Sequence, residues 1–306
     1  MKKKISPAVI LMLCLVFYIN SIVAPNFAQG YKVKVEKDIN YLPDGKVDPR
    51  HQLDIYYPEG LKNCPVYFFV HGGGWKKGDK SQYAKLGKTY ARKGIVTVVI
   101  NYSLSPEVQH PAHILNTASA FAWTTANIRN YGGDPEKIFV SGHSAGAHLT
   151  ALLVLDDKYL KKYNLSSANI KGLIPIAGVY KIDSASEKIR KKEKTTLQIA
   201  SNMFTDAFGK DRSKWVDASP ITYVRKDTPP ILLMIGEKEG RFLELQGKML
   251  FQALKKKGAP VQWAVIPGKG HITEIMVGGV NDTTSPLVMD FIEKNKGRFI
   301  IESTEG

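Results

Sequence analysis

The segment "SGHSAG", residues 141 to 146, places one serine between two glycines, after an apolar run and before a helical pattern. Glycine is unfavourable inside helices and strands and is used where the backbone must turn tightly. A G-x-S-x-G pattern between a strand and a helix is typical of a nucleophile elbow, a sharp turn that exposes the serine hydroxyl. We therefore predict that Ser144 is the nucleophile of an acyl-transfer reaction. Because a Ser-Gly turn before a helix has a similar composition, the other parts of such a site must be found.

Acyl transfer at a serine also needs hydrogen-bond donors for the oxyanion that forms during the reaction. The residue after the nucleophile supplies one donor, which predicts the amide of Ala145. The loop "HGGGWKKGDK", residues 71 to 80, directly follows the apolar run "VYFFV". Its glycines allow a close approach of the backbone, so we predict that the Gly73 and Gly74 amides are the other donors. A phosphate-binding loop is the alternative, but the Gly-Lys-Ser/Thr ending of such loops is missing.

The general base is expected to be a histidine that follows both the serine and an acid in the chain. Only His148 and His271 follow Ser144. His148 falls one turn along the predicted helix, where a structural role is expected, whereas His271 lies in the glycine-rich segment "IPGKGH". We therefore predict His271 as the base. The acid should follow the apolar run "ILLMIG", where Glu237 and Glu239 are both candidates.

Other conspicuous residues have ordinary explanations. His110 and His113 in "HPAH" have a spacing seen in metal sites, but no further cluster of ligands accompanies them. We predict neither a metal nor a cofactor. We expect His71 to hydrogen-bond its own loop into shape. Trp75 follows the oxyanion glycines directly and could either line the acyl pocket or pack in the core.

The hydrophobic pattern predicts the elements that position these residues. Residues 31–40 and 52–58 alternate apolar and polar side chains around the turn "LPDG", which predicts an antiparallel hairpin. Six later segments are continuous apolar runs, typical of strands buried on both faces of a parallel sheet. They span 66–71, 95–102, 138–142, 172–178, 231–236 and 261–268. Helical patterns alternate with them at 81–93, 112–130, 145–155, 243–257 and 285–296. We predict an α/β fold with a mostly parallel central sheet of about eight strands, flanked by helices.

The first residues differ from the rest of this 306-residue chain, whose composition is 43% hydrophobic and 23% charged. Lys2 to Lys4 precede an apolar run from Ala8 to Ile19, and small and polar residues follow up to Ala28. This pattern is typical of a secretory signal peptide, with an uncleaved anchor as the alternative. We predict cleavage after Ala28, a single domain over residues 29–306, and export to the periplasm or the medium.

Charge and cysteine content limit the partners of the protein. The formal net charge is +15, and removal of residues 1–28, which contain three lysines and no acid, would leave +12. The basic residues are scattered, without the basic stripe that a nucleic-acid groove requires, so we predict neither nucleic-acid binding nor stable membrane insertion. Cys64 would be the only remaining cysteine, so no intramolecular disulfide is expected. The sequence leaves the oligomeric state open.

Residues 179–220 form an insertion that is richer in charge than its surroundings. Long insertions at the carboxyl edge of such a sheet often act as lids over the site. A solvent-exposed surface segment with one or two helices has the same composition. We expect the insertion to be either a small cap over the site or such a surface segment.

These motifs resemble those of α/β-hydrolases of the carboxylesterase type, and are similar to hormone-sensitive-lipase-like esterases, feruloyl-esterase-like bacterial hydrolases and kynurenine formamidases. The resemblance covers about residues 50–296. It depends on "LDIYYP", "HGGGW", "NYSLSPEVQHPA", "YGGDPEKIFVSGHSAGAHL", "ASP" at 218–220, "PPILLMIGEKE" and "GKGH". It implies an acid three residues after the glycine that closes the strand, which is Glu239. Those families usually have aspartate there and often arginine in place of Ser103, so this chain departs from them at both positions.

The resemblance implies a serine hydrolase that cleaves small-molecule esters with Ser144, His271 and Glu239. Nothing here resembles the large apolar lid of a lipase, which favours short acyl chains. The segment "GHSAGAHL" is closer to formamidases, so an amide hydrolase of that type is an alternative that export disfavours. A non-catalytic binding protein of the same fold is a further alternative. Such proteins typically lack a member of the triad, and this chain has candidates for all three.

Overall fold

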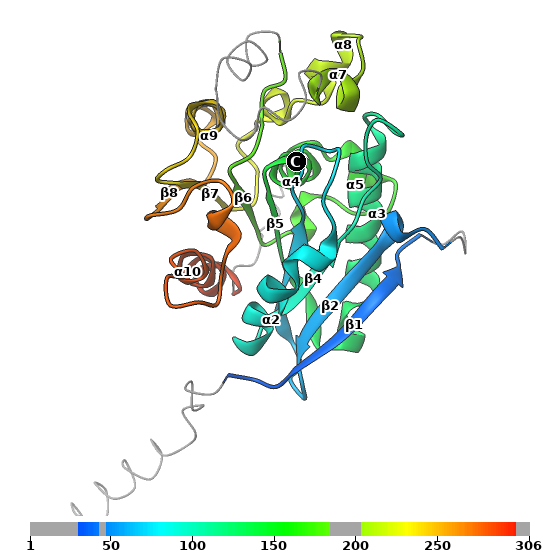
Figure 1. The fold of residues 1–306 in the computed structure, drawn as a ribbon, viewed down its shortest axis with the longest axis vertical. Helices are drawn as coiled ribbons and strands as arrows, with labels where there is room; N and C mark the ends of the chain where they lie inside the picture. The colour runs from blue at the N-terminus through cyan, green and yellow to red at the C-terminus, as the bar shows by residue number, and fades with distance from the viewer. Residues whose placement is uncertain (1–29, 43–46, 184–202, 298–306) are drawn as a thin grey trace, which may run out of the picture.

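The computed structural model describes residues 30–42, 47–183 and 203–297. The expected signal peptide, residues 1–28, lies outside this range. One sheet of eight strands crosses the described part of the chain (Figure 1). The strands are β1 (Val33–Asn40), β2 (Gln52–Pro58), β3 (Cys64–Val70), β4 (Val96–Ile100), β5 (Gly133–His143), β6 (Gly172–Ile176), β7 (Ile231–Gly236) and β8 (Val261–Ile266). Their order in the sheet is β1-β2-β4-β3-β5-β6-β7-β8.

The pairing of the strands confirms the prediction of a mostly parallel sheet. β1 pairs antiparallel with β2 and β2 antiparallel with β4, whereas all other neighbours are parallel. The predicted hairpin is therefore present at one edge of the sheet. β5 begins at Gly133, five residues before the apolar run that predicted it, because Gly133 pairs with Cys64 ahead of a register shift. The polar residues of that early part carry no hydrophobic signal.

Helices cover both faces of the sheet. The longer ones are α2 (Ala84–Arg92), α3 (Ala112–Asn127), α4 (Ala145–Leu155), α9 (Arg241–Lys257) and α10 (Ser285–Asn295). Short helices are α5 (Lys158–Lys161), α7 (Met203–Phe208) and α8 (Ser213–Asp217). Single 3-10 turns are η1 (Pro49–His51), η2 (Lys80–Tyr83), η3 (Ile128–Tyr131), η4 (Ser167–Asn169), η5 (Pro220–Tyr223) and η6 (Thr273–Ile275). None of the helices in the described ranges is long and apolar enough to cross a bilayer.

Two hydrophobic cores lie on opposite faces of the sheet. On one face the strands pack against α3, α4 and α9, and on the other against α2 and α10. The continuous apolar run of β3 contributes side chains to both cores, because successive side chains of a strand point to opposite faces of the sheet. Phe68 packs on Phe121 of α3 with ring centroids 5.6 Å apart, while Tyr67 packs on Tyr90 of α2 at 4.7 Å. The result is a three-layer α/β/α architecture.

The topology brings the predicted site residues to one edge of the sheet. The glycine loop 71–80 follows β3, Ser144 follows β5, Glu239 follows β7 and His271 follows β8. All four strands are parallel, so their carboxyl ends lie at the same edge. α7 and α8, from the predicted insertion, lie above α4 in the view of Figure 1.

Candidate active site

Ser144 stands at a sharp turn between β5 and α4. Its φ is +53°, a conformation that costs energy for a residue with a side chain and that recurs at functional turns. The Ser144 amide donates to the carbonyl oxygen of Ile176, at the end of β6, over 2.9 Å. α4 begins at the next residue, so the positive end of its dipole lies beside the serine. This backbone geometry is that of a nucleophile elbow.

The two glycines of the elbow are explained by close packing of α4 on the sheet. A Cβ atom on Gly146 would lie 2.1 Å from the carbonyl oxygen of Val70 in β3. A Cβ atom on Gly142 would lie 2.5 Å from the carbonyl carbon of Gly146. Any side chain at either position would push the helix away from the strands and move Ser144 with it.

The glycine loop lies against the elbow. A Cβ atom on Gly72 would be 3.3 Å from Cβ of Ser144. Gly73 has a φ of +123°, and the loop turns back on it, since the amides of Lys76 and Lys77 both donate to the Gly73 carbonyl over 3.2 Å. Within the described part of the chain, the amides of Gly73, Gly74 and Ala145 donate to no other residue. All three predicted oxyanion donors thus have N–H groups that a ligand could use.

His71 and two tyrosines hold the glycine loop in shape. His71 Nδ1 donates to the Gly72 carbonyl over 2.7 Å, and its ring stacks on Tyr102 at 4.4 Å. The Gly72 amide donates to the Tyr83 hydroxyl over 3.1 Å. Burial lowers the pKa of His71 to about 4, so the ring is neutral at pH 7. These contacts are those of the shaping role expected for His71.

His271 and Glu239 form a buried pair. His271 Nδ1 lies 2.7 Å from Glu239 Oε2, and the two side chains are only 11% and 2% exposed. Oε1 of the same carboxylate accepts from the Gly240 amide over 2.6 Å. Because Nδ1 donates to the carboxylate, Nε2 is the imidazole nitrogen that can accept a proton.

Glu237, the other candidate acid, points elsewhere. Its Oε2 accepts from the Gly268 amide over 2.7 Å, and the residue is exposed to solvent. Of the two glutamates that the sequence left open, Glu239 is the one that contacts His271.

Ser144 and His271 are near each other but are not hydrogen-bonded. The ring of His143, the neighbour of Ser144, lies against that of His271 with centroids 4.5 Å apart and an angle of 40° between the ring planes. This contact brings the imidazole next to the elbow. Among the described residues, the Ser144 hydroxyl has no hydrogen-bond partner. Catalytic hydrogen bonds are often long without substrate and tighten when it binds.

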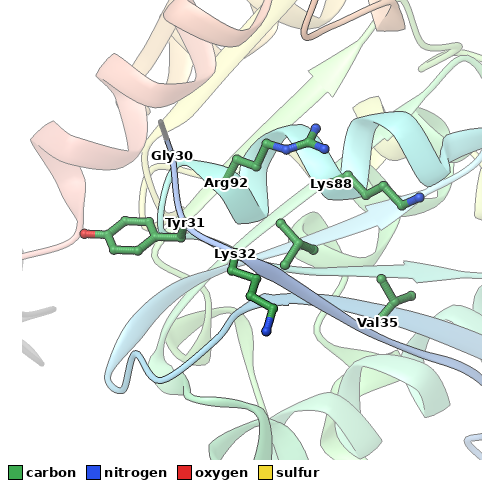
Figure 2. A pocket seen from close by; sticks show the side chains of 7 residues that line it. Gly30, Tyr31, Lys32, Val35, Lys88 and Arg92 are labelled. Atoms are coloured by element: carbon green, nitrogen blue, oxygen red, sulfur yellow. The ribbon is translucent and has the colours of Figure 1, made fainter. Parts of the chain in front are cut away.

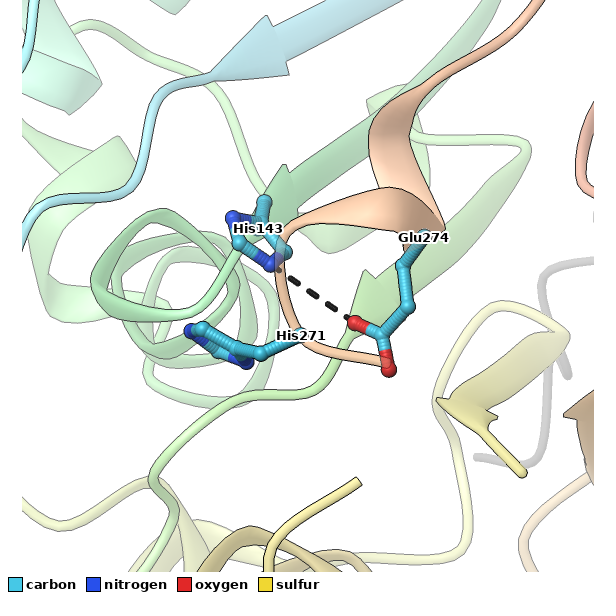
Figure 3. A group of neighbouring side chains, drawn as sticks. All are labelled: His143, His271 and Glu274. Carbon is cyan, nitrogen blue, oxygen red and sulfur yellow. Dashed lines mark ion pairs between the residues drawn. The ribbon is translucent and has the colours of Figure 1, made fainter. Parts of the chain in front are cut away.

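His143 and Glu274 also belong to this site, although the sequence did not reveal them. Glu274, in η6, is fully buried, and its Oε1 accepts from the Gly236 amide. Its Oε2 lies 3.6 Å from His143 Nε2, and neither atom has a hydrogen-bond partner (Figure 3). Burial, and then the negative charge of Glu239, raise the pKa of Glu274 to about 9. His143 occupies a variable position of G-x-S-x-G and Glu274 lies between Thr273 and Ile275 after His271, so no sequence motif marks either residue.

The same cluster has the spacing of a metal site. One ligand atom each of His143, His271 and Glu274 lies within 4.8 Å of the others. However, His271 Nδ1 already donates to Glu239, and a carboxyl with a pKa of about 9 is protonated at pH 7. Ligands must be deprotonated to bind a metal well. We therefore interpret the cluster as side chains packed around the imidazole of His271 and not as a metal site.

Trp75 is fully buried beneath α7. Its ring contacts Phe208 of α7 at 4.9 Å, and its Nε1 donates to His148 Nδ1 over 3.2 Å. His148 Nε2 in turn donates to the Ala218 carbonyl over 2.7 Å. These contacts correspond to the packing alternative for Trp75 and to a structural role for His148.

The described part of the insertion 179–220 rests on the glycine loop. Lys76 forms an ion pair with Asp206 of α7 at 2.5 Å. A Cβ atom on Gly74 would lie 2.8 Å from Met203 Sδ, at the start of α7. This part of the insertion therefore has the position expected of a cap, while residues 184–202 lie outside the described range.

His110 and His113, the pair with metal-like spacing, bind protein partners instead. His110 Nε2 lies 2.9 Å from Asp217 Oδ2, and His113 Nε2 lies 2.9 Å from the Ser105 hydroxyl.

A cavity of about 570 Å³ is lined by residues other than those of the predicted active site (Figure 2). It is formed by β1, the residues just before it, and α2. Its lining residues are Gly30, Tyr31, Lys32, Val33, Val35, Lys88 and Arg92. None of them is a predicted site residue, so we do not connect this cavity with acyl transfer.

Comparison with known proteins agrees with the architecture. A profile of the BD-FAE family matches residues 53–254, a range that contains Ser144 and Glu239 and ends before His271. Among solved structures, esterase B from Lactobacillus rhamnosis superposes with a TM-score of 0.75 over 94% of this chain and 93% of that one, at 18% identity. The Pyrobaculum calidifontis esterase gives 0.70 over 96% and 95%, at 20% identity. At such identities the likeness shows a shared fold.

Curated relatives are similar over most of this chain. Esterase LipQ of Mycobacterium tuberculosis is 32% identical over 85% of this chain and 62% of its own length. The probable carboxylic ester hydrolase LipM of the same organism is 28% identical over 83% of this chain and 60% of its own length. This chain therefore spans about 60% of the length of these relatives.

Proposed function

The chain belongs to the BD-FAE family within the α/β-hydrolase carboxylesterases, and from this membership and the site geometry we propose that it is a serine carboxylesterase that hydrolyses small esters. The observation that carries the proposal is the combination of Ser144 at φ +53° with the His271–Glu239 pair beside it. The names of the relatives LipQ and LipM support the same reaction class.

In the proposed acylation step, the Ser144 hydroxyl attacks the ester carbonyl carbon and His271 Nε2 takes the hydroxyl proton. The carbonyl oxygen becomes an oxyanion, which the amides of Gly73, Gly74 and Ala145 stabilise, each by about 3 kcal/mol in comparable enzymes. Glu239 keeps Nδ1 protonated and stabilises the imidazolium. When the tetrahedral intermediate collapses, the bond to the alcohol oxygen breaks and Nε2–H protonates the leaving alcohol.

Deacylation repeats these steps with water. His271 Nε2 takes a proton from the attacking water, the same three amides stabilise the second oxyanion, and the acid leaves as Ser144 recovers its proton. In this proposal, Ser144, His271, Glu239 and the three amides act in both half-reactions. No cofactor enters either half-reaction.

We extend the proposal to short acyl chains. Its support is the start of α7, where Met203 lies on Gly74 and limits the space beside the oxyanion loop. A series of p-nitrophenyl esters from acetate to dodecanoate tests this directly. We expect kcat/KM to be highest for the shortest members, and a preference for the longest chain would contradict the assignment.

The reaction class is tested with p-nitrophenyl acetate and the Ser144→Ala variant. Because the variant lacks the covalent step, we expect turnover to fall by at least about 10³-fold while the melting temperature stays within a few degrees. A fluorophosphonate probe should label the wild type at Ser144 alone, as peptide mass spectrometry would show. Labelling at another serine would refute the nucleophile. N-formylkynurenine in the same assay separates the formamidase alternative, which predicts faster amide than ester turnover.

A further inference from the structure

Two carboxyl groups lie close to the imidazole of His271. Glu239 Oε2 accepts from His271 Nδ1 over 2.7 Å, and an oxygen of the fully buried Glu274 lies within 4.8 Å of a ring nitrogen of His271. Glu239 and Glu274 are near enough to interact directly. Two ionised carboxylates in contact without water would repel each other strongly, so one of them must keep a proton. Glu239 already accepts two N–H donors, from His271 and from Gly240, whereas Glu274 accepts only one, from Gly236. The proton therefore belongs on Glu274.

The hydrogen bonds of Glu274 lead to the same assignment. As an ionised group, Glu274 would be an acceptor at both oxygens, but only Oε1 has a donor, the Gly236 amide. Oε2 is buried without a hydrogen-bond partner. His143 Nε2, which also has no hydrogen-bond partner, lies 3.6 Å from it (Figure 3). A proton on Glu274 turns this acceptor into a donor, and the Glu239 carboxylate is the strongest acceptor beside it.

We propose that Glu274 is a positioning residue that acts through Glu239: its carboxyl group donates a hydrogen bond to the Glu239 carboxylate and holds it against His271. This inference deepens the proposed esterase function and rests on it for its kinetic consequences. The long, flexible glutamate side chain of Glu239 is then fixed from three sides, by His271, by the Gly240 amide and by Glu274.

The surroundings of Glu274 predict when this hydrogen bond is lost. The titratable groups that face it are Glu239 from the β7–α9 loop, His143 from the end of β5, His271 from its own loop, and Tyr180 after β6. Burial and the charge of Glu239 raise the pKa of Glu274 to about 9, and its hydrogen bond with Glu239 acts in the same direction. Above that pH, Glu274 ionises, the hydrogen bond disappears, and the two carboxylates repel. Turnover should then decline.

Paired substitutions at Glu274 test the proposal. Glu274→Met fills a similar volume but has no donor, so we expect kcat to fall about 10-fold to 100-fold with little change in KM, as for groups that orient a primary side chain. Glu274→Gln has an N–H donor for Glu239 and an oxygen for the Gly236 amide. It should recover most of the loss at pH 7, and the decline above pH 9 should disappear because an amide does not ionise. Glu237→Gln, on the same loop as Glu239 but exposed, is the matched control.

Three results would overturn the inference. One is a Glu274→Gln variant that melts like the wild type but is as slow as Glu274→Met. The second is a wild-type profile of kcat that stays flat from pH 7 to 10. The third is a decline of kcat at the same alkaline pH in the wild type and in the Glu274→Gln variant. Melting curves of both variants separate lost folding from lost chemistry.

An infrared measurement tests the proton without any substrate. We expect the C=O stretch of a protonated carboxyl in the wild type at pH 7, its loss above about pH 9, and its absence in Glu274→Gln. If the protein hydrolyses no ester, the proposed function fails, but this band still decides whether Glu274 holds the proton. A missing band at pH 7 in an active enzyme would refute the inference alone.

Discussion

Glu239 contacts His271 with a side chain that is one methylene longer than aspartate and has one more torsion to fix. The site supplies the extra constraints. The Gly240 amide binds Oε1 at 2.6 Å, leaving Oε2 for His271 at 2.7 Å. The carboxylate is only 2% exposed, so water does not compete for either oxygen. A glutamate at this position is thus compatible with an ordered imidazole.

Replacement of Glu239 by glutamine tests its role. Glu239→Gln keeps the shape but removes the charge that stabilises the imidazolium and selects the tautomer of His271. In the comparable substitution of a serine protease, kcat falls by about 10⁴. We expect a loss of at least about 10²-fold in kcat here, measured with p-nitrophenyl acetate beside a thermal melt.

Glu237→Gln is the control for this experiment, because Glu237 is exposed and its side chain accepts a hydrogen bond from the Gly268 amide. Such a change should alter stability by no more than about 0.5 kcal/mol and leave turnover unchanged. If Glu237→Gln were the crippled variant, the acid would be misassigned. If both variants stayed active, the orienting group would lie outside this loop.

At the scale of elements, α7 contacts the predicted oxyanion loop through Lys76, Gly74 and Trp75. Phe208 is 1% exposed and packs against both Trp75, at 4.9 Å, and His148 of α4, at 5.5 Å. Trp75 directly follows the oxyanion glycines, and α4 begins at the elbow. A single aromatic side chain therefore connects α7 to both halves of the predicted oxyanion hole.

Phe208→Ala should show this connection. Removing a buried phenylalanine costs about 3–5 kcal/mol of unfolding free energy. Because the cavity would lie under Trp75, we also expect a loss of kcat in the molecules that remain folded, measured well below the melting temperature. Val216→Ala on α8 is a suitable control, since Val216 is 58% exposed and should change stability by no more than about 0.5 kcal/mol. Equal kinetics in both variants would show that α7 supports only stability.

The elements that were predictable from sequence are those with a strong local signal. The continuous apolar runs predicted β3, β4, β6 and β7, and the alternation in residues 31–40 predicted the hairpin, because burial on two faces or on one leaves different patterns. The elbow pattern predicted α4 from Ala145 to Leu155. Each of these patterns lies within a single strand or helix, so it can be recognised without knowing the fold.

The cluster of His143, His271 and Glu274 could not be predicted in this way. His143 and Glu274 are 131 positions apart in the chain, and they meet only because β5 and β8 end at the same edge of the sheet. Glu274 is also an acid buried at 0% exposure, which contradicts the usual rule for charged residues. Its raised pKa removes the contradiction, but that shift depends on burial and on Glu239, neither of which the sequence displays. The choice between Glu237 and Glu239 needed either a resemblance or the fold for the same reason.

At the scale of the whole molecule, we propose that the mature protein begins after Ala28 and is exported. The tripartite pattern of residues 1–28 supports this, and β1, the first described strand, begins only at Val33. Expression of the full chain in a bacterial host should yield a mass that lacks residues 1–28. A protein that retains them in the membrane fraction would favour the uncleaved anchor.

The molecule as a whole also buries an unusual set of neutral histidines. Burial lowers the pKa of His71 and His113 to about 4 and that of His148 to about 3. It also lowers the pKa values of His110 and His143. In the unfolded chain each ring has a pKa near 6.5. Below that pH the unfolded chain binds protons that the folded protein does not, so acid favours unfolding until the folded pKa values are reached.

The magnitudes show that this effect should dominate the mild acid range. Each fully titrating histidine changes the unfolding free energy by about 1.4 kcal/mol per pH unit. Glu274 acts in the opposite direction, because its raised pKa favours the folded state as the pH falls toward 4.5. It is a single group, however, whereas five buried histidines favour unfolding in acid. We therefore expect urea unfolding to give a free energy that falls steeply between pH 6.5 and 4.5. His113→Gln, which can still bond Ser105, should make this slope shallower by up to about 1.4 kcal/mol per pH unit. A free energy that is constant over this range would show that the buried histidines are protonated in the folded state, and with it the neutral form assigned to His71 beside the oxyanion loop would be wrong.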